Sequence, residues 1–169
     1  MDEGRFDFVL GMNQGALGSE EFQKPRGIRE LLDRNLQHDY DQYTGGLPCE
    51  SGKKKAGRWH RDVNSLFDDQ KVDVALPPWY FTMLVPLCPI HSENGPTEFS
   101  PGSHKKELDG LPSEPHDQVV SARADVGDAV LFNGKILHRG GEKREDGARH
   151  VIYVVFKKCW YTDEHMQLI

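Results

Sequence analysis

The tetrapeptide Trp59-His60-Arg61-Asp62 organises the chain around it. Side chains alternate between the two faces of an extended strand, so His60 and Asp62 point the same way while Arg61 points away. Such a pair can bind one metal ion but lacks a third ligand, for which His138 is the candidate. Two histidines and one carboxylate form the facial triad that holds non-haem Fe(II) and leaves other positions open.

Downstream of this tetrapeptide, short apolar runs alternate with turn residues. The turns include Asn94-Gly95-Pro96 and Gly127-Asp128. Many short strands of this kind are typical of an all-β sandwich or barrel, and the two facing sheets of a jelly roll suit their number. The sequence therefore predicts a mainly β fold. The predicted strands cover residues 80–87, 97–99, 119–123, 129–132, 136–138 and 151–156.

The part of the chain before the tetrapeptide shows three different patterns. Residues 5–10 alternate loosely between polar and apolar and are predicted to form an edge strand ended by Gly11. Apolar side chains recur at helical spacing over residues 28–37, which predicts one amphipathic helix packed against a sheet. Residues 39–57 are polar and Gly-rich and predict a loop, with a short strand near Tyr43 left open.

Composition narrows the class of protein. A chain of 169 residues suits one domain. Its formal net charge of −6 argues against a nucleic-acid partner, because phosphate backbones are bound by basic surfaces. The 3 cysteines are too few and too scattered for a disulfide framework, which favours a reducing setting. The sequence shows no secretory signal pattern and no apolar run long enough to span a bilayer, so we expect a cytoplasmic protein without a membrane partner.

Arg149 opens a strand-like run that ends at Phe156. By period-two alternation, Arg149 shares a face with Val151, Tyr153 and Val155, whose side chains should point into a core. A buried guanidinium needs an anionic partner. That partner is either a protein carboxylate or the far carboxylate of a dicarboxylate cofactor that chelates the metal, which arginine can bind with two parallel hydrogen bonds.

Five segments taken together resemble the phytanoyl-CoA dioxygenase (PhyH) family of Fe(II)- and 2-oxoglutarate-dependent oxygenases. The segments are His60-Arg61-Asp62, Glu93-Asn94-Gly95-Pro96-Thr97-Glu98-Phe99-Ser100-Pro101-Gly102-Ser103-His104, Gly127-Asp128-Ala129-Val130-Leu131-Phe132, His138 and Arg149. The resemblance covers residues 58–156 and implies a double-stranded β-helix (a cupin-like jelly roll) with one or two short N-terminal helices.

The resemblance also implies a reaction and a site. His60, Asp62 and His138 would be the iron ligands, and Arg149 would pair with the distal carboxylate of 2-oxoglutarate. In the family, dioxygen and 2-oxoglutarate react to give succinate, CO2 and a hydroxylated substrate. The related halogenases have a small residue in place of the carboxylate, so Asp62 favours hydroxylation.

Several further residues are expected near this site. Thr82 could offer its hydroxyl to the cofactor, although a core-packed or solvent-facing threonine is an equal alternative. Gly140 stands where the family often has a hydroxyl residue. Arg139 is a candidate contact for an anionic substrate, and His104 is expected in a tight turn without binding metal. Since only 59 residues precede His60, residues 1–169 are expected to form a single PhyH-like domain with a shortened N-terminal region.

Two functions remain open at this point. The first is an iron dioxygenase that hydroxylates a small organic molecule, and the second is a metal-binding jelly-roll protein that holds a ligand without turnover. A protein-kinase catalytic loop, which shares the tripeptide His60-Arg61-Asp62, needs an asparagine where Phe67 stands. A zinc hydrolase is also disfavoured, because the chain has no His-Glu-x-x-His motif.

Overall fold

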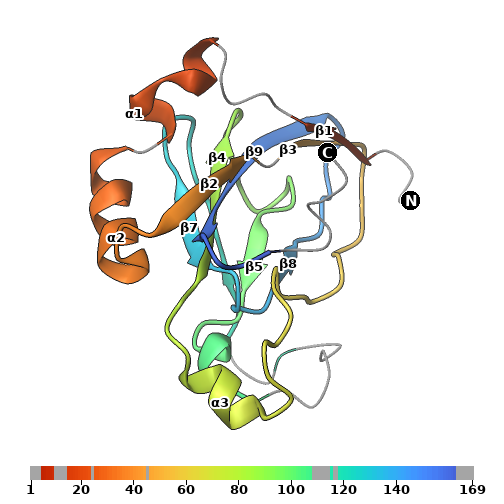
Figure 1. The fold of residues 1–169 in the computed structure, drawn as a ribbon. Helices are drawn as coiled ribbons and strands as arrows, with labels where there is room; N and C mark the ends of the chain where they lie inside the picture. Colours follow the sequence, from red (N-terminus) through yellow and green to blue (C-terminus); the bar gives the residue numbers. More distant parts are fainter. Residues whose placement is uncertain are drawn as a thin grey trace.

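Two antiparallel sheets face each other in the computed structural model of the chain, which describes residues 5–9, 15–23, 25–44, 46–107, 115 and 118–162 (Figure 1). The larger sheet has the order β1-β3-β9-β4-β7, with β2 also paired to β9, and the smaller has the order β6-β5-β8. The strands are β1 (Arg5–Val9), β2 (Tyr40–Thr44), β3 (Gly46–Ser51), β4 (Tyr80–Pro86), β5 (Thr97–Phe99), β6 (Val120–Ser121), β7 (Val130–Asn133), β8 (His138–Gly140) and β9 (Ala148–Lys158). The helices are η1 (Gly15–Gly18), α1 (Glu20–Gln23), α2 (Arg26–Leu36), α3 (Gln70–Ala75) and η2 (Ser103–Lys105).

The side chains of strand β9 point alternately to the two faces of the larger sheet, one packed in a core and the other open to a cavity. On one face, Ile152, Val154 and Phe156 are buried in a core together with side chains from α2. On the other face, Arg149 and the alternate residues after it line a cavity between the sheets. The period-two prediction for this run is therefore confirmed, and the helix and the cavity lie on opposite sides of one sheet.

Helix α2 covers the outer face of the larger sheet. Leu32 and Leu36 are 0% exposed and pack against Met83 and its neighbours on β4 and β9. Burial of a leucine side chain contributes roughly 1.5–3 kcal/mol, so this pair fixes the helix on the sheet. The helix ends at Gln37, which takes the left-handed conformation and donates its N–H to the carbonyl of Asp33. The amphipathic helix predicted over residues 28–37 is confirmed.

A hydrogen bond from Tyr40 joins β2 to α2. The Tyr40 hydroxyl donates to Oδ1 of Asp33 over 3.0 Å. Burial, together with the hydrogen bond and the charge of Asp33, raises the pKa of Tyr40 to about 12. Because this pKa lies above the ordinary value of 10.0, folding favours the protonated phenol. Its contribution to stability is complete below the ordinary value and is lost as the pH rises toward the folded pKa.

Replacing Tyr40 with phenylalanine should flatten this alkaline loss of stability. The ring, whose centroid lies 6.3 Å from that of Phe156, would stay in place, and only the ionisable hydroxyl would go. We expect urea unfolding of the natural chain to lose more free energy between about pH 10 and about pH 12 than unfolding of the variant. Parallel pH profiles for the two proteins would contradict this assignment.

Over residues 39–57, the short strand left open near Tyr43 is confirmed as β2, but the expectation that the rest is a loop is wrong where β3 lies. Strands β2 and β3 lie there, and both pair with β9, for example Tyr40 with Lys158 and Cys49 with His150. Neither segment has an apolar period of its own, so the strands form because β9 offers hydrogen-bonding partners. Strand β1 lies at the edge of the sheet as predicted, paired only with β3 among the described residues. Gly11, expected to end it, lies outside the described residues.

Helix α3 is an element that the sequence pattern did not indicate. It begins after Asp69, whose side chain accepts a hydrogen bond from the N–H of Lys71, and it ends before two consecutive prolines. The strand predicted at 136–138 is shifted to β8, because Ile136 closes a turn by donating its N–H to the carbonyl of Asn133. Among the described residues, no helix has the length and apolar character that crossing a bilayer requires.

Candidate metal centre

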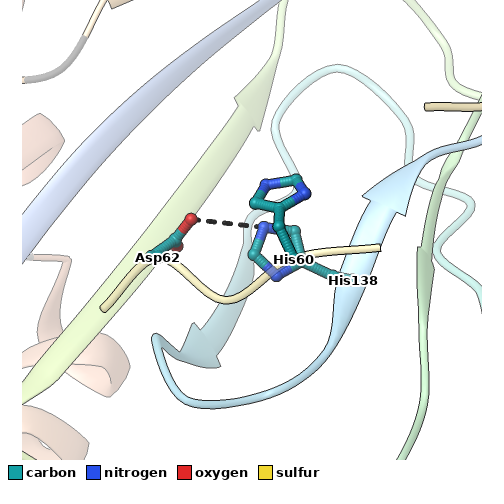
Figure 2. A group of neighbouring side chains, drawn as sticks. All are labelled: His60, Asp62 and His138. Atoms are coloured by element: carbon teal, nitrogen blue, oxygen red, sulfur yellow. Dashed lines mark ion pairs between the residues drawn. The ribbon is translucent and has the colours of Figure 1, made fainter. Parts of the chain in front are cut away.

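Figure 2 shows His60, Asp62 and His138 gathered at one point, although His138 comes from a distant part of the chain. The backbone explains the meeting. The N–H of His60 donates to the carbonyl of His138 over 2.9 Å, and the reverse bond spans 3.0 Å, so the two residues form an isolated antiparallel bridge. One potential ligand atom from each of the three side chains lies within 4.8 Å of the other two. The structure therefore brings the three predicted ligands together.

Backbone carbonyls orient both imidazole rings. Nδ1 of His60 lies 3.0 Å from the carbonyl oxygen of Arg58, and Nδ1 of His138 lies 3.0 Å from that of Ile136. A carbonyl oxygen can only accept, so each Nδ1 carries a proton, and Nε2 is the ring nitrogen that is left to face the site. This is the tautomer that a metal-binding histidine needs, and the second hydrogen bond fixes the ring.

The carboxylate of Asp62 is held at both oxygens. Oδ1 lies 3.3 Å from Nε2 of His138, and Oδ2 accepts a hydrogen bond of 2.5 Å from the hydroxyl of Thr82. Burial alone would raise the pKa of Asp62, but the hydrogen bonds from His138 and Thr82 and the nearby imidazoles outweigh burial and lower it below its ordinary value. Asp62 is therefore an anion at neutral pH, as a metal ligand must be.

Thr82 lies on β4 and is 6% exposed, which excludes the solvent-facing alternative. Its side chain lines the cavity, and its hydroxyl is bonded to Asp62, while its predicted contact with the cofactor stays a prediction. Because Oδ2 of Asp62 accepts the hydrogen bond from Thr82, Oδ1 is the oxygen that remains for a metal ion. The Thr82 hydroxyl thus fixes the orientation of the Asp62 carboxylate.

Replacing Thr82 with valine should lower the affinity for Fe(II) by roughly 10–100-fold, the usual cost of losing a partner of a metal ligand. Valine keeps the shape of threonine and removes only the hydroxyl. Serine keeps the hydroxyl and should keep most of the affinity. Anaerobic titration of both variants with Fe(II) measures the effect, and equal affinities for the valine and serine variants would refute the positioning role.

A cavity of about 310 Å³ opens beside these residues, between the two sheets. Its walls come from alternate residues of β4 and β9 and from Phe132 of β7, all in the larger sheet, together with residues of the smaller sheet. Arg149, 8% exposed, lies in this lining and donates a hydrogen bond to the carbonyl of Gly95. The lining residues are His60, Asp62, Tyr80, Thr82, Leu84, Thr97, Phe132, His138, Gly140, Arg149, Val151, Tyr153 and Val155.

Sequence reasoning missed Tyr80, Leu84 and Phe132 as lining residues. The alternation of β4 around Thr82 could have indicated the first two. The third packs on His138, with ring centroids 4.8 Å apart. Gly140 lines the cavity, and a Cβ there would meet no atom within 4 Å, so the missing side chain leaves open space.

Two other candidates lie outside the cavity. The guanidinium of Arg139 donates to Glu98 over 2.7 Å and lies 4.6 Å from the ring centroid of Trp59, so its charge is neutralised by the protein. His104 lies in η2 and lines a different cavity. Trp79 and Phe81 are core residues, 2% and 7% exposed.

Two imidazoles and an ionised carboxylate beside a cavity between facing antiparallel sheets define a jelly-roll protein with a metal-binding donor set. The family model of phytanoyl-CoA dioxygenase (PhyH) matches residues 16–151. The chain belongs to this family.

Curated relatives agree with this assignment. The chain is 36% identical over 123 residues to the iron/alpha-ketoglutarate-dependent dioxygenase ausU of Aspergillus calidoustus, covering 72% of this chain and 41% of that protein. It is 31% identical over 115 residues to the dioxygenase trt7 of Aspergillus terreus, covering 67% of this chain and 40% of that protein. The chain thus spans less than half the length of these relatives.

Solved structures establish the fold. HygX from Streptomyces hygroscopicus, solved with nickel and 2-oxoglutarate, aligns with a TM-score of 0.70 at 15% identity over 95% of this chain and 72% of its own. The epimerase SnoN from nogalamycin biosynthesis aligns with a TM-score of 0.63 at 17% identity, over 90% of this chain and 67% of its own. The predicted double-stranded β-helix is confirmed.

Proposed function

We propose that this chain carries the active site of an Fe(II)- and 2-oxoglutarate-dependent dioxygenase that hydroxylates a small organic substrate. The main support is one cavity whose lining contains His60, Asp62 and His138 together with the buried Arg149. Relatives described as iron/alpha-ketoglutarate-dependent dioxygenases add weight to the proposal. The proposal includes the absence of a nucleic-acid partner, which rests on the formal net charge of −6, and a cytoplasmic location without a membrane partner, which rests on the 3 scattered cysteines and the lack of a recognisable secretory or spanning segment in this sequence.

The donor set fits Fe(II). Two neutral imidazoles and one carboxylate suit this ion, and three protein ligands leave further positions for a cofactor and dioxygen. An arginine fork in the same lining fits the free carboxylate of a bound dicarboxylate. When bound, iron and 2-oxoglutarate supply the oxidising chemistry that activates dioxygen and yields succinate and CO2.

The residues of the chain then have distinct tasks. His60, Asp62 and His138 would hold the metal, and Thr82 keeps one oxygen of Asp62 turned away from it. Arg149 would anchor 2-oxoglutarate at the other end of the molecule. The apolar side chains of Leu84, Val151 and Val155 would exclude water from the cofactor.

Replacing Arg149 with glutamine is expected to weaken 2-oxoglutarate binding by about 10–100-fold, because a charge-assisted bond contributes roughly 1.5–3 kcal/mol. Lysine at the same position keeps the charge without the fork and should give an intermediate loss. Calorimetric titration of the metal-loaded protein measures both. Since Arg149 is not in the proposed ligand set, Fe(II) affinity should stay unchanged, and a parallel loss of Fe(II) affinity would contradict this division of roles.

The function is tested by adding Fe(II) and 2-oxoglutarate to the anaerobic protein. We expect a visible charge-transfer band that requires both additions, followed by substrate-dependent release of succinate in air. Metal and 2-oxoglutarate binding without succinate release for any substrate would favour the binding protein without turnover. Failure of both to bind would overturn the proposal.

A further inference from the structure

We propose that a second cavity, behind the metal-binding segment, binds the carboxylate or phosphate head of a small organic anion. This cavity of about 350 Å³ shares no described lining residue with the metal cavity. It lies against α3, at the end of the molecule away from α1 and α2 (Figure 1). The inference does not depend on the proposed dioxygenase function.

The walls of the second cavity differ in chemistry. One wall is apolar and consists of residues 74–76 and Pro78. The other is polar and carries two cations, Lys105 and Lys135, together with His104 and Asn133, whose amide oxygen already accepts the N–H of Lys135. Within the described part of the chain, no carboxylate lines the cavity. An occupant with an anionic head and an apolar body matches both walls.

The positive charge beside the cavity exceeds the negative charge. Lys135 is 4% exposed, and its ammonium donates to the carbonyl of Asp73 over 2.8 Å and lies 4.7 Å from the ring centroid of Trp79. Neither contact neutralises a full charge. The carboxylate of Asp73, 3% exposed, attracts both Lys135 and Arg61 and also accepts the N–H of Leu66. Two cations thus share one buried anion.

His104 adds a buried polar atom that nothing in the described residues satisfies. Its Nδ1 is buried and has no hydrogen-bond partner there, and the same is true of Nε of Arg61. Burial, and then the cations Lys105, Lys135 and Arg61, lower the pKa of His104. An oxyanion in the cavity would supply both the missing acceptor and the missing negative charge.

Helix η2, which carries His104 and Lys105 of the second cavity, is hydrogen-bonded to the two segments that contain the proposed iron ligands. Arg61, between His60 and Asp62, donates to the carbonyl of Ser103 over 2.7 Å. The hydroxyl of Ser103 accepts the N–H of Leu137 over 2.8 Å, one residue before His138. Helix η2 therefore contacts both segments that carry the ligands, and neither Arg61 nor Ser103 is in the lining of the metal cavity.

Calorimetry with phenyl phosphate, benzoate, inorganic phosphate and neutral benzyl alcohol tests the proposal. The metal-loaded protein is kept saturated with 2-oxoglutarate, so that the metal cavity is filled. We expect at least one of the two aromatic anions to bind, inorganic phosphate to bind more weakly, and benzyl alcohol not to bind. Tighter binding of phenyl phosphate assigns a phosphate head, and tighter binding of benzoate assigns a carboxylate head.

Variants locate the binding. His104→Leu and Lys105→Ala should each weaken it by at least about 10-fold, the loss typical of a charge-assisted bond. Lys71→Ala removes an equal charge from an exposed position of α3 and should leave it unchanged. Binding of neither aromatic anion, or equal losses in Lys71→Ala and Lys105→Ala, would overturn the proposal.

Discussion

Fe(II) affinity is expected to fall by at least about 100-fold when Asp62 is replaced by alanine, since losing a mere partner of a ligand already costs roughly 10–100-fold. Asp62 would be the only anionic ligand in the proposed set, and its lowered pKa keeps it charged at neutral pH. Without it, two neutral imidazoles would have to hold a divalent cation alone. The charge-transfer band with 2-oxoglutarate should disappear with the metal.

Anaerobic calorimetry with Fe(II) measures this loss, with two matched variants beside it. Asp62→Asn keeps the shape and an oxygen that can accept from Thr82 but removes the charge, so its affinity should lie between those of the natural protein and the alanine variant. Asp68→Ala removes an exposed carboxylate nearby and should leave the affinity unchanged. Natural affinity in Asp62→Ala would disprove the assignment of Asp62 as a ligand.

Replacing Lys143 with methionine is expected to lower the free energy of unfolding by about 3 kcal/mol, because each of three half-buried carbonyls that lose a charged donor costs roughly 1 kcal/mol, the low end of the range for buried groups. Lys143 is 2% exposed. Its ammonium donates to three backbone carbonyls, those of Gly52 (3.0 Å), Glu145 (2.6 Å) and Gly147 (2.9 Å). These bonds tie the segment before β9 to the end of β3.

Lys157 supplies the matched control. Its ammonium also donates to a backbone carbonyl, that of Tyr161, over 2.6 Å, but to no other in the described part of the chain. Lys157→Met should therefore cost only about 0.5–1.5 kcal/mol. Urea denaturation of both variants measures the difference. Equal losses would mean that the number of carbonyls bound by Lys143 does not matter to stability.

Local spacing explains what could be predicted. The alternation that puts Arg149 on the cavity face of β9 is a property of any strand, and so is the shared direction of His60 and Asp62. The helical spacing of the leucines in α2 is equally local. These features needed no knowledge of which strands pair.

Contacts between residues far apart in the sequence explain which strands and which ion pair could not be predicted. Strands β2 and β3 are polar segments that become strands because β9, about a hundred residues later, completes their hydrogen bonds. Arg139 looked available to a substrate, but Glu98, 41 residues earlier, binds it on the neighbouring strand. No local pattern encodes either contact.

The sequence by itself determined the mainly β class, the His60-Asp62 pair and the inward direction of Arg149, because these follow from residue types and periods of two or 3.6. Only the tertiary structure decided that the hydroxyl of Thr82 binds Asp62 and that a cation-lined cavity lies behind the metal segment. Both depend on strands and helices that are far apart in the chain and meet only when the two sheets close on each other.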